Sequence, residues 1–499
     1  MADVTLLGRI KNHLIRMQCR RIGRSLSRST ADQLEQAGQR ELLRAFARAA
    51  REVPAYRDLL ARQGVSPAAV RTIDDFRRLV PVVDKQAVFG RHDLTSLLAG
   101  GRLGESSVFW TSSGHSGVYS FGVDNAAQQE RAAIAAEFLL DRTFGVLGRR
   151  TLLVNCLPMG VKIPVRAMSL AETSVRTDAA LAIIRSLGGQ FEQIILMAES
   201  LVLKKLIEDG PAAGVDWHKL TVHAVTGAEF IAENYRSYLA HLMGIDFDHP
   251  ERGVIGVNMG MSELALSVFS ESVETIRIRR LAQGDIAVRQ ALFGRTDIVP
   301  ELMQYFPMRT YVETIEEPQD EAQRLADGAN PSGQLVVSVL DPHARLPLIR
   351  YRTGDQVTTM PYARLEALVR LFGREDLLPA WKLPLGIIWG RNPHVQTPEG
   401  PISPAHVKEA LYADFDLAGR VTGVFVIQTP PGSRGGEPCR PTLLVQLKEG
   451  QTGSSRLADR LAERLAHYTA AHVNLHLAAY RDFPVGMELD YERKCRYVA

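Results

Sequence analysis

The sequence predicts an α/β protein: a large layered α/β domain with a β-rich part, followed by a small α+β domain. Predicted strands at 152–155, 193–196 and 222–225 alternate with predicted helices, as in layered α/β folds. The chain has 499 residues, too many for one ordinary domain. We therefore expect a large domain over residues 1–385 and a small, mobile C-terminal domain over 386–499.

Apolar residues at helical spacing predict the helices of the large domain. Residues 31–52 place Leu34, Leu42 and Phe46 on one face. Residues 5–28 form a basic amphipathic pattern, which leaves open a helix on a membrane surface or a helix packed against the protein. The other predicted helices are 126–142, 170–187, 198–208 and 232–242.

The predicted small domain begins with a helix at His406. Strands at 423–428 and 442–446, a helix at 456–472 and a strand at 473–477 follow it. This order predicts a compact α+β unit that could act as a lid.

Composition excludes several classes of protein. The formal net charge of +3 is too small to argue for nucleic acid binding. No apolar run reaches about 18 residues, so we expect no membrane span. Neither a zinc site nor a disulfide framework is indicated, because the four cysteines form no C-x-x-C pair. With no signal-peptide core at the N-terminus, we expect a cytoplasmic protein.

A polar loop interrupts two predicted strands, where residues 109–121 have the sequence FWTSSGHSGVYSF. Glycines let a backbone approach an anion closely, and successive amides and hydroxyls can then face phosphate oxygens. No Gly-Lys-Ser/Thr follows, so the loop is not a Walker motif. A ligand-free hairpin remains an equal alternative. The candidate phosphate-binding residues are Thr111, Ser112, Ser113, Gly114, His115, Ser116 and Gly117.

Several segments in a fixed order carry a family resemblance. Residues 40–85 include REVPAYRDLLARQGV and TIDDFRRLVPVVDKQ, and the hydroxyl-rich loop follows them. Further on come a Gly-Ala-Glu turn, the sequence MGMSE at 259–263 and RYRTGD at 350–355. This order resembles the phenylacetate–CoA ligases, a branch of the adenylate-forming superfamily that includes acyl-CoA synthetases, peptide-synthetase adenylation domains and luciferases. RYRTGD is the most specific match, and the resemblance covers most of the chain.

The resemblance implies an ATP site built from these motifs. The hydroxyl-rich loop would bind phosphates, and Glu263 would bind Mg²⁺ through a hard carboxylate oxygen. Asp355 would accept hydrogen bonds from two ribose hydroxyls. Met259 stands where the family has an aromatic residue that packs on adenine. The further nucleotide-binding residues that it implies are Gly227, Ala228, Glu229, Asn258, Gly260, Met261 and Ser262.

The sequence motifs for the hinge and for the catalytic lysine match the family less well than RYRTGD does. The family has a Gly-Arg hinge between its two domains, and this chain offers Arg374 and Arg391 for it, a choice that the sequence leaves open. Lys494 lies where the superfamily keeps a lysine that reaches into the adenylation site, although the surrounding motif is degenerate.

The implied activity is ATP-dependent activation of a carboxylic acid as an acyl-adenylate, followed by acyl transfer. Coenzyme A is the favoured acceptor. An amine, a carrier-protein thiol or a cysteine of the chain (Cys156 or Cys495) stays open, as does a nucleotide-binding homologue without catalysis. An aryl or arylacetic acid is the implied substrate, and a homodimer is compatible with the sequence. The candidate pocket residues are Asn155, Pro158, Met159, Gly160 and Leu264, beside Asn258 and Met261.

Overall fold

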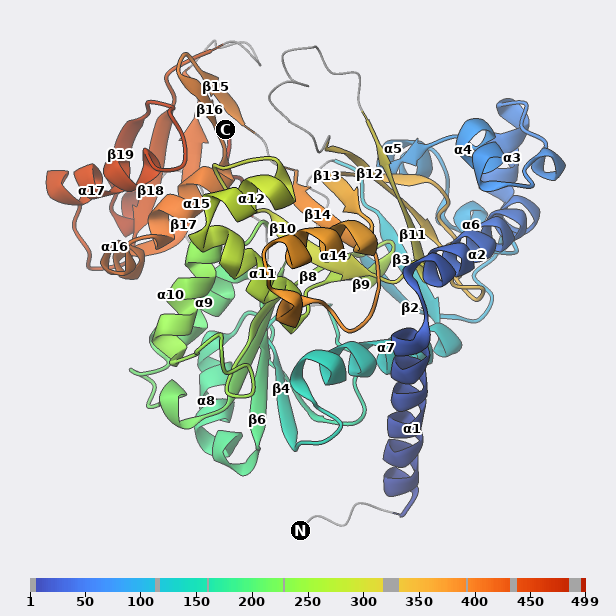
Figure 1. The fold of residues 1–499 in the computed structure, drawn as a ribbon, viewed down its shortest axis with the longest axis horizontal. Coiled ribbons are helices and arrows are strands. Elements are labelled where there is room, and N and C mark those ends of the chain that lie inside the picture. Colours follow the sequence, from blue (N-terminus) through green and yellow to red (C-terminus); the bar gives the residue numbers. More distant parts are fainter. Residues whose placement is uncertain are drawn as a thin grey trace.

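The structure is a computed structural model. It describes residues 6–112, 117–158, 161–227, 229–316, 332–391, 394–430, 438–483 and 495–499, and for 6–12, 265 and 266 it describes the backbone alone. Its central feature is a 12-stranded sheet (Figure 1), which confirms the predicted α/β class. The strands of this sheet are β1 (Val83–Asp84), β4 (Thr151–Asn155), β5 (Ser169–Glu172), β6 (Gln193–Met197), β7 (Val222–Gly227), β8 (Ile255–Met261), β9 (Ala265–Ser270), β10 (Glu301–Tyr305), β11 (Thr310–Ile315), β12 (Gly333–Val339), β13 (Tyr351–Met360) and β14 (Leu385–Gly390).

The sheet has a parallel half and an antiparallel half. Its order is β11-β12-β13-β14-β10-β9-β8-β7-β6-β4-β5, and β1 pairs with β13. Strands β4 to β8 are parallel, whereas β8 to β14 pair antiparallel along this order. Every residue of β4 is buried, as expected for a strand covered on both faces. The helices of the parallel half are α7 (Ala126–Phe144), α8 (Thr177–Leu187), α9 (Ser200–Asp209) and α10 (Glu233–Met243).

One predicted helix is partly wrong. The sequence predicted a helix over 170–187, but its first residues form β5 and α8 begins only at Thr177. Leu170 and Ala171 pair with Leu153 and Val154 at the sheet edge, so the backbone hydrogen bonds of a strand replace those of a helical turn.

The antiparallel half of the sheet, which is the β-rich part of the large domain, lies above α7 in Figure 1. The helices of this half are α11 (Val273–Gly284), α12 (Ile286–Phe293) and α14 (Tyr362–Leu371). Strands β2 (Ser106–Thr111) and β3 (Phe121–Asn125) form a separate hairpin that carries the hydroxyl-rich loop. From their sequence, Val108, Phe109 and Trp110 are expected to end a buried strand, but Phe109 is 49% exposed and β2 pairs only with β3.

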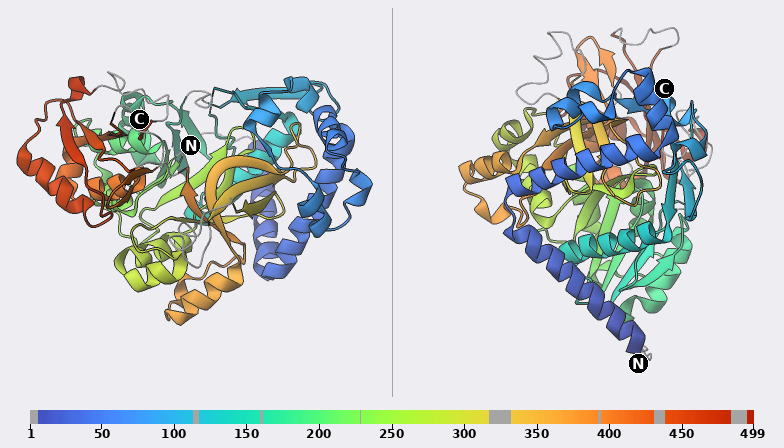
Figure 2. Two further views of the ribbon diagram at one scale, coloured as in Figure 1. Left: turned by 90° about the horizontal axis from the view of Figure 1, so that it is seen from above. Right: turned by 90° about the vertical axis from the view of Figure 1, so that its right-hand side faces the viewer.

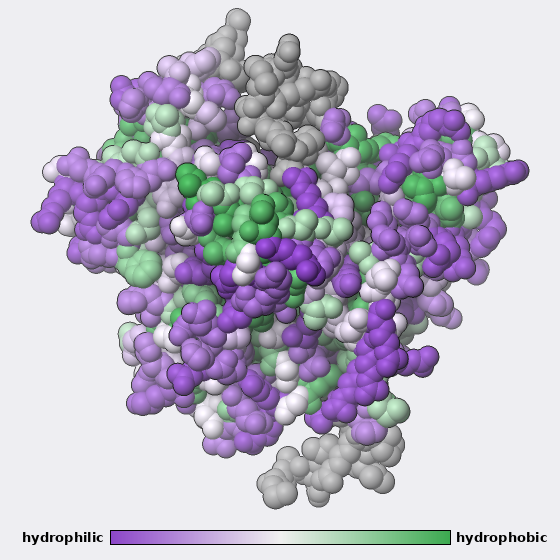
Figure 3. Space-filling model, in the orientation of Figure 1, coloured by the Kyte–Doolittle hydropathy of each residue, from purple (hydrophilic) through white to green (hydrophobic). Residues whose placement is uncertain are grey.

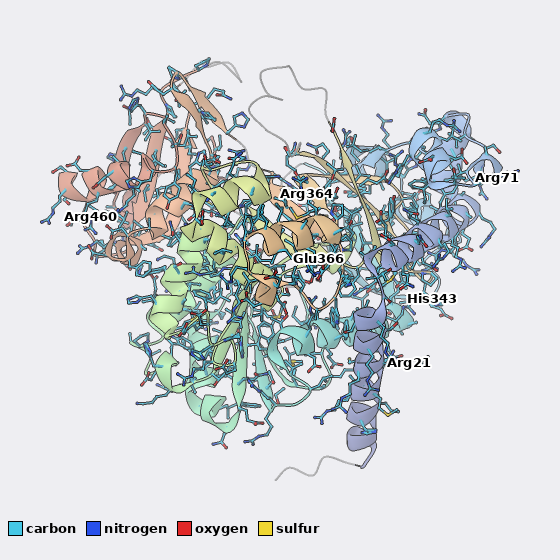
Figure 4. The ribbon with its side chains drawn as sticks, viewed as in Figure 1. Arg21, Arg71, His343, Arg364, Glu366 and Arg460 are labelled. Atoms are coloured by element: carbon cyan, nitrogen blue, oxygen red, sulfur yellow. The ribbon has the colours of Figure 1, made fainter. Side chains whose placement is uncertain are left out.

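Helices precede the sheet and cover one of its flanks. They are α1 (Leu6–Arg28), α2 (Ala31–Glu52), α3 (Pro54–Arg62), α4 (Ile73–Leu79), α5 (Lys85–Phe89) and α6 (Leu94–Leu97). Ile15, Cys19 and Leu26 of α1 are buried in a cluster with Phe138 and Trp381, so this helix packs against the protein by one face. The side of α1 seen in Figure 3 is mainly hydrophilic, although Leu14 and Met17 are also exposed, and Arg21 projects from the helix (Figure 4). Within the described ranges, no helix is both long and apolar enough to span a membrane.

The C-terminal part forms its own layer, which packs beside α9 and α10 (Figure 2). Its strands β17-β18-β19 form one sheet, and the predicted helix over 456–472 ends early, at Leu465.

The proposed boundary between the large and the small domain depends on β14. Because β14 belongs to the large sheet, we place this boundary after Gly390 rather than after Leu385. The helices and strands of the C-terminal part are β15 (Val395–Thr397), β16 (Gly400–Ile402), α15 (Pro404–Tyr412), α16 (Phe415–Arg420), β17 (Val421–Gln428), β18 (Thr442–Leu447), α17 (Ser455–Leu465) and β19 (Asn474–Ala478).

Helix α15 attaches this part to the rest of the molecule. The Glu409 carboxylate accepts hydrogen bonds from the backbone N–H groups of Glu233 and Asn234, at 3.0 and 3.1 Å. These are the first residues of α10, where amides have no partner within the helix. Lys408 pairs with Glu229 at 2.8 Å. The two neighbouring side chains of α15 therefore hold the C-terminal part against the parallel half of the sheet.

Candidate active site

Three segments that are far apart in the sequence meet at the carboxylate of Glu263. The hydroxyls of Ser120 and Ser262 each donate to Oε2 at 2.9 Å, and the Tyr351 hydroxyl donates to Oε1 at 2.9 Å. We call these four residues the Glu263 junction. It joins the β2–β3 hairpin, the turn after β8 and the start of β13, which are three of the motifs that the sequence singled out.

The base of the hydroxyl-rich loop is fixed on this junction. The Ser112 amide donates to the Ser120 carbonyl at 3.0 Å, and the Ser120 amide donates to Ser112 Oγ at 3.1 Å. The Trp110 indole donates to the carbonyl of Ser262. A Cβ on Gly122 would lie 1.9 Å from Trp110 Nε1, so glycine is required there. The hairpin is thereby attached to the turn that follows β8.

The structure covers only part of the predicted phosphate-binding loop. Thr111 and Ser112 line a large cavity beside the junction. Gly117 is exposed and is not among the residues that line it. The predicted residues Ser113, Gly114, His115 and Ser116 lie outside the described residues.

Lys85 is a basic residue at this site that the sequence analysis did not single out. Its ammonium donates to Ser112 Oγ at 3.1 Å and lines the same cavity. Burial lowers the pKa of Lys85, while the nearby Glu263 carboxylate opposes that shift. Lys85 reaches the site because β1 pairs with β13, which brings Asp84 beside Arg352. Lysines are scarce in this sequence, and that signal could have identified it.

Asp355 and Arg391 form a pair near the junction. Their Oδ1 and Nε atoms are 3.4 Å apart, and the Asp355 side chain is 13% exposed. Gly390 takes a left-handed φ of 69°, which turns the chain after β14 toward Asp355. Arg374 instead pairs with Asp376 at 2.9 Å and is absent from the described lining of the cavity. Of the two hinge candidates, the structure brings only Arg391 to the site.

The residues that the resemblance places beside adenine lie at the ends of β7 and β8. Gly227 pairs with Asn258, and a Cβ on Gly227 would lie 2.1 Å from the Asn258 carbonyl oxygen. Glycine is therefore required for these strands to approach so closely. Asn258 Oδ1 accepts from Ser267 at 2.6 Å. Ala228 lies outside the described residues, and the members of this side that line the cavity are Gly227, Asn258, Met259, Gly260, Met261 and Ser262.

Glu229 has a different position from the one predicted. It lines the cavity, but its carboxylate pairs with Lys408 at 2.8 Å and accepts from Ser200. Burial opposes ionisation of Glu229, but the charge of Lys408 and the hydrogen bonds from Lys408 and Ser200 together lower its pKa. The carboxylate is therefore occupied by a contact with α15 and not by the nucleotide side of the cavity.

The predicted acid-binding residues divide into two groups. Pro158, Met261 and Leu264 line the cavity. Asn155 does not: its amide donates to the Val161 carbonyl at 2.9 Å, so the side chain fixes the loop after β4. Met159 and Gly160 lie outside the described residues.

Burial disfavours the thiolate form of both cysteines considered as acyl acceptors. Cys156 is fully buried, and burial raises its pKa. Burial also raises the pKa of Cys495 to about 12. Both thiols are protonated at neutral pH, whereas the thiolate is the nucleophile.

The acidic groups fit a nucleotide-bound cation and not a metal site built by protein alone. In the part of the chain that the structure describes, no three His, Cys, Asp or Glu side chains gather as metal ligands. Mg²⁺ usually takes one or two carboxylates together with substrate phosphates, so a single carboxylate at Glu263 suits it. Lys494 lies outside the described residues.

Comparison with known proteins gives a match in structure alone. No protein-family model and no curated protein matches the chain. A 2-hydroxyisobutyryl-CoA ligase, solved in a postadenylation state in complex with R3-HIB-AMP, aligns with a TM-score of 0.67 and 13% identity, over 95% of this chain and 90% of that chain. The same ligase in a thioesterification state, with 2-HIB-AMP and CoA, aligns over the same shares with a TM-score of 0.54 and 13% identity. The chain thus has the fold of this CoA ligase, and its backbone is closer to the postadenylation arrangement.

Proposed function

We propose that this chain is an ATP-dependent carboxylic acid-activating ligase that forms an acyl-adenylate and transfers the acyl group to coenzyme A. The observation that carries this proposal is the Glu263 junction. It joins the base of the hydroxyl-rich loop, the MGMSE turn and the start of RYRTGD beside one cavity, with Asp355 and Arg391 next to them.

Each residue of the site has a role in this proposal. Asp355 binds the ribose hydroxyls, because a fixed carboxylate can accept from both. Lys85 and the hydroxyls around Ser112 bind the phosphates. Glu263 is the carboxylate that would hold Mg²⁺, which supplies neutralisation of phosphate charge when it is bound.

The chemistry consists of two displacements. A carboxylate oxygen of the acid attacks the α-phosphorus of ATP, the bond to pyrophosphate breaks, and pyrophosphate leaves. The thiol sulfur of coenzyme A then attacks the acyl carbonyl carbon, loses its proton and displaces AMP. The protein aligns the reactants and stabilises charge; it supplies no nucleophile of its own.

The position of the C-terminal part fits the first of these steps. The backbone resembles the postadenylation arrangement of a CoA ligase more than its thioesterification arrangement. A second step would require α15 to leave α10, which breaks the Glu409 contacts and the Lys408–Glu229 pair.

ATP–pyrophosphate exchange across a panel of carboxylic acids tests the proposal. We expect exchange with at least one acid, and mass spectrometry of the product with coenzyme A, amines and a carrier protein then identifies the acceptor. The aryl and arylacetic acids that the sequence resemblance implies belong in this panel. If ATP binds but no acid supports exchange, the chain is a nucleotide-binding homologue and the proposal fails.

A further inference from the structure

Arg309 lies in the active-site cavity without a partner of its own. It lines the cavity, and the residue is exposed. Within the described residues, its guanidinium forms neither a hydrogen bond nor an ion pair. Burial nevertheless lowers its pKa, so the side chain faces a hollow enclosed by protein and not the outer surface. An arginine keeps its charge in proteins, so Arg309 is a cation with unused donors inside the cavity.

The backbone that carries Arg309 is held by neighbouring segments. Its N–H donates to the Phe306 carbonyl at 2.9 Å, which closes the turn between β10 and β11, and its carbonyl accepts from the Leu340 amide at 3.1 Å. Helix α2 packs on the same turn, where a Cβ on Gly38 would overlap the Pro307 carbonyl. The point from which the side chain leaves the backbone is therefore fixed, as a binding residue requires.

The charged neighbours of Arg309 neutralise each other. Among the described residues, Asp341 attracts its guanidinium and Arg131 repels it. These two form an ion pair, with Arg131 Nη2 and Asp341 Oδ1 3.2 Å apart, and Asp341 also accepts from the His343 amide at 2.8 Å. The charge of Arg309 is left without a counterion, which is unfavourable in a buried position unless a ligand pairs with it. We call Arg309 and the adjacent Arg131–Asp341 pair the Arg309 site.

The Arg309 site is separate from the phosphate side of the cavity. Asp124 of β3 lies close enough to the Arg131–Asp341 pair for both charges to shift its pKa. Ser120, a member of the Glu263 junction, precedes Asp124 by four residues along the hairpin, which corresponds to about 13 Å of extended chain. An anion at the Arg309 site is therefore not the carboxylate that reacts beside the junction.

We propose that the Arg309 site is a second anion-binding subsite of the cavity, which takes a carboxylate or phosphate group of a substrate. A planar guanidinium presents its N–H donors as a fork that matches either group. The inference rests on the proposed ligase function, which supplies two sources of such a group. One source is a second carboxylate on the acid, and the other is the 3′-phosphate of coenzyme A.

Pairs of ligands that differ by one anionic group test the subsite and identify its source. Titration calorimetry of the full chain compares coenzyme A with dephospho-coenzyme A, and dicarboxylic acids from butanedioate to dodecanedioate with the monocarboxylic acids of the same length. In one of these comparisons, the ligand with the additional anion should bind about tenfold more tightly or better. A preference in the first comparison assigns the site to coenzyme A, and one in the second assigns it to the acid.

A matched pair of variants shows whether Arg309 causes this preference. Arg309→Met removes the guanidinium, whereas Arg364→Met makes the same change at an exposed position of α14 (Figure 4) that is not among the residues lining the cavity. Arg309→Met should reduce the preference about tenfold, and Arg364→Met should retain it. Arg309→Gln takes the place of Arg309→Met if that variant does not fold. A preference that is absent, or that persists in a folded Arg309 variant, refutes the subsite.

ATP–pyrophosphate exchange separates a failure of the subsite from a failure of the ligase function. An Arg309-dependent preference in binding, without exchange for any acid, would support the subsite and exclude the ligase function. Exchange with some acid, but no Arg309-dependent preference in either comparison, would exclude the subsite and leave the ligase function intact.

Discussion

The Tyr351 hydroxyl donates to Oε1 of Glu263 at 2.9 Å, although the two residues are 88 positions apart in the chain. Tyr351 is 1% exposed, and burial together with the Glu263 carboxylate raises its pKa well above the usual value. The phenol therefore remains protonated, and a donor, at neutral pH. A rigid donor on β13 thus fixes the orientation of the one carboxylate that joins the three motifs.

Replacing this donor should weaken catalysis without unfolding the protein. In Tyr351→Phe, Glu263 loses one of its three hydrogen bonds, and a loss of about 1–1.5 kcal/mol corresponds to roughly a tenfold fall in kcat/KM. We expect that fall in ATP–pyrophosphate exchange, with a higher MgCl₂ concentration needed for half-maximal rate. Tyr362→Phe is the matched control. Tyr362 of α14 is also a buried phenol, and it donates to the Pro379 carbonyl at 3.0 Å. Equal effects of the two substitutions would contradict a role for the Glu263 junction.

The two Gly-Arg pairs provide a direct comparison of hinge candidates. Arg391→Ala should raise the KM for ATP about tenfold, because it removes a charged group 3.4 Å from Asp355, the proposed ribose ligand. Arg374→Ala should leave the KM unchanged, since Arg374 pairs with Asp376. Initial rates at varied ATP concentrations measure both. A larger effect of Arg374→Ala would overturn the assignment of Arg391.

Lys85 should be required for nucleotide turnover. Lys85→Met keeps the length of the side chain but removes the ammonium that donates to Ser112 Oγ. Loss of a partly buried charge next to the phosphates should lower kcat/KM for ATP by about 10–100-fold. Lys382→Met is the control, because Lys382 is exposed and does not line the cavity. If Lys85→Met keeps full activity, Lys85 only supports the hairpin.

Most of the candidate site residues could be proposed from short sequence segments, whereas the others depend on how distant strands pair. Glu263 follows β8 and Asp355 lies within β13, and each belongs to a short segment with a recognisable sequence, so both could be predicted from short segments. Nothing local distinguishes Arg374 from Arg391, because the choice depends on β14 pairing with β13. Lys85 reaches the site only through the pairing of β1 with β13. These contacts join residues far apart in sequence, where spacing and composition carry little information.

Asn155 illustrates the opposite kind of error. A polar side chain at the end of a buried strand is a reasonable candidate for a binding residue. Here the Asn155 amide donates to the Val161 carbonyl at 2.9 Å, and its oxygen accepts from the Leu157 amide at 3.2 Å. Buried polar groups are normally hydrogen-bonded, and this one uses its capacity to fix a loop. The sequence shows the residue type but not which partner it has.

Lys494 remains a prediction from the sequence resemblance. Lys494→Ala should lower adenylation by orders of magnitude, because the ammonium would stabilise charge that develops on the α-phosphate. Acyl transfer to coenzyme A from a supplied acyl-adenylate should be retained, and the melting temperature should not change. Pyrophosphate exchange, thioester formation and thermal unfolding measure the three quantities. Undiminished exchange would exclude Lys494 as the catalytic lysine.

The contact between α15 and α10 should make stability depend on pH. Burial raises the pKa of Glu409 to about 7 from an ordinary value of 4.5, with the Glu233 carboxylate adding to the shift and Arg279 and the two accepted N–H groups opposing it. The folded state thus binds a proton more tightly than the unfolded state. The resulting stabilisation is complete below pH 4.5 and is lost as the pH rises to about 7, a change of roughly 3 kcal/mol at most.

Glu409→Gln tests this assignment, because an amide of the same size does not titrate and still accepts one of the two N–H groups. The free energy of unfolding of the variant minus that of the unsubstituted protein should increase between pH 5 and pH 8, because only the unsubstituted protein loses this stabilisation. Glu301, whose pKa burial also raises to about 7, supplies a separate contribution that is common to both proteins and cancels in the difference. Denaturant unfolding of both proteins at pH 5, 6, 7 and 8 measures this difference in the free energy of unfolding. A difference that does not vary with pH would show that Glu409 is ionised throughout, and that the two α10 amides and Arg279 outweigh its burial.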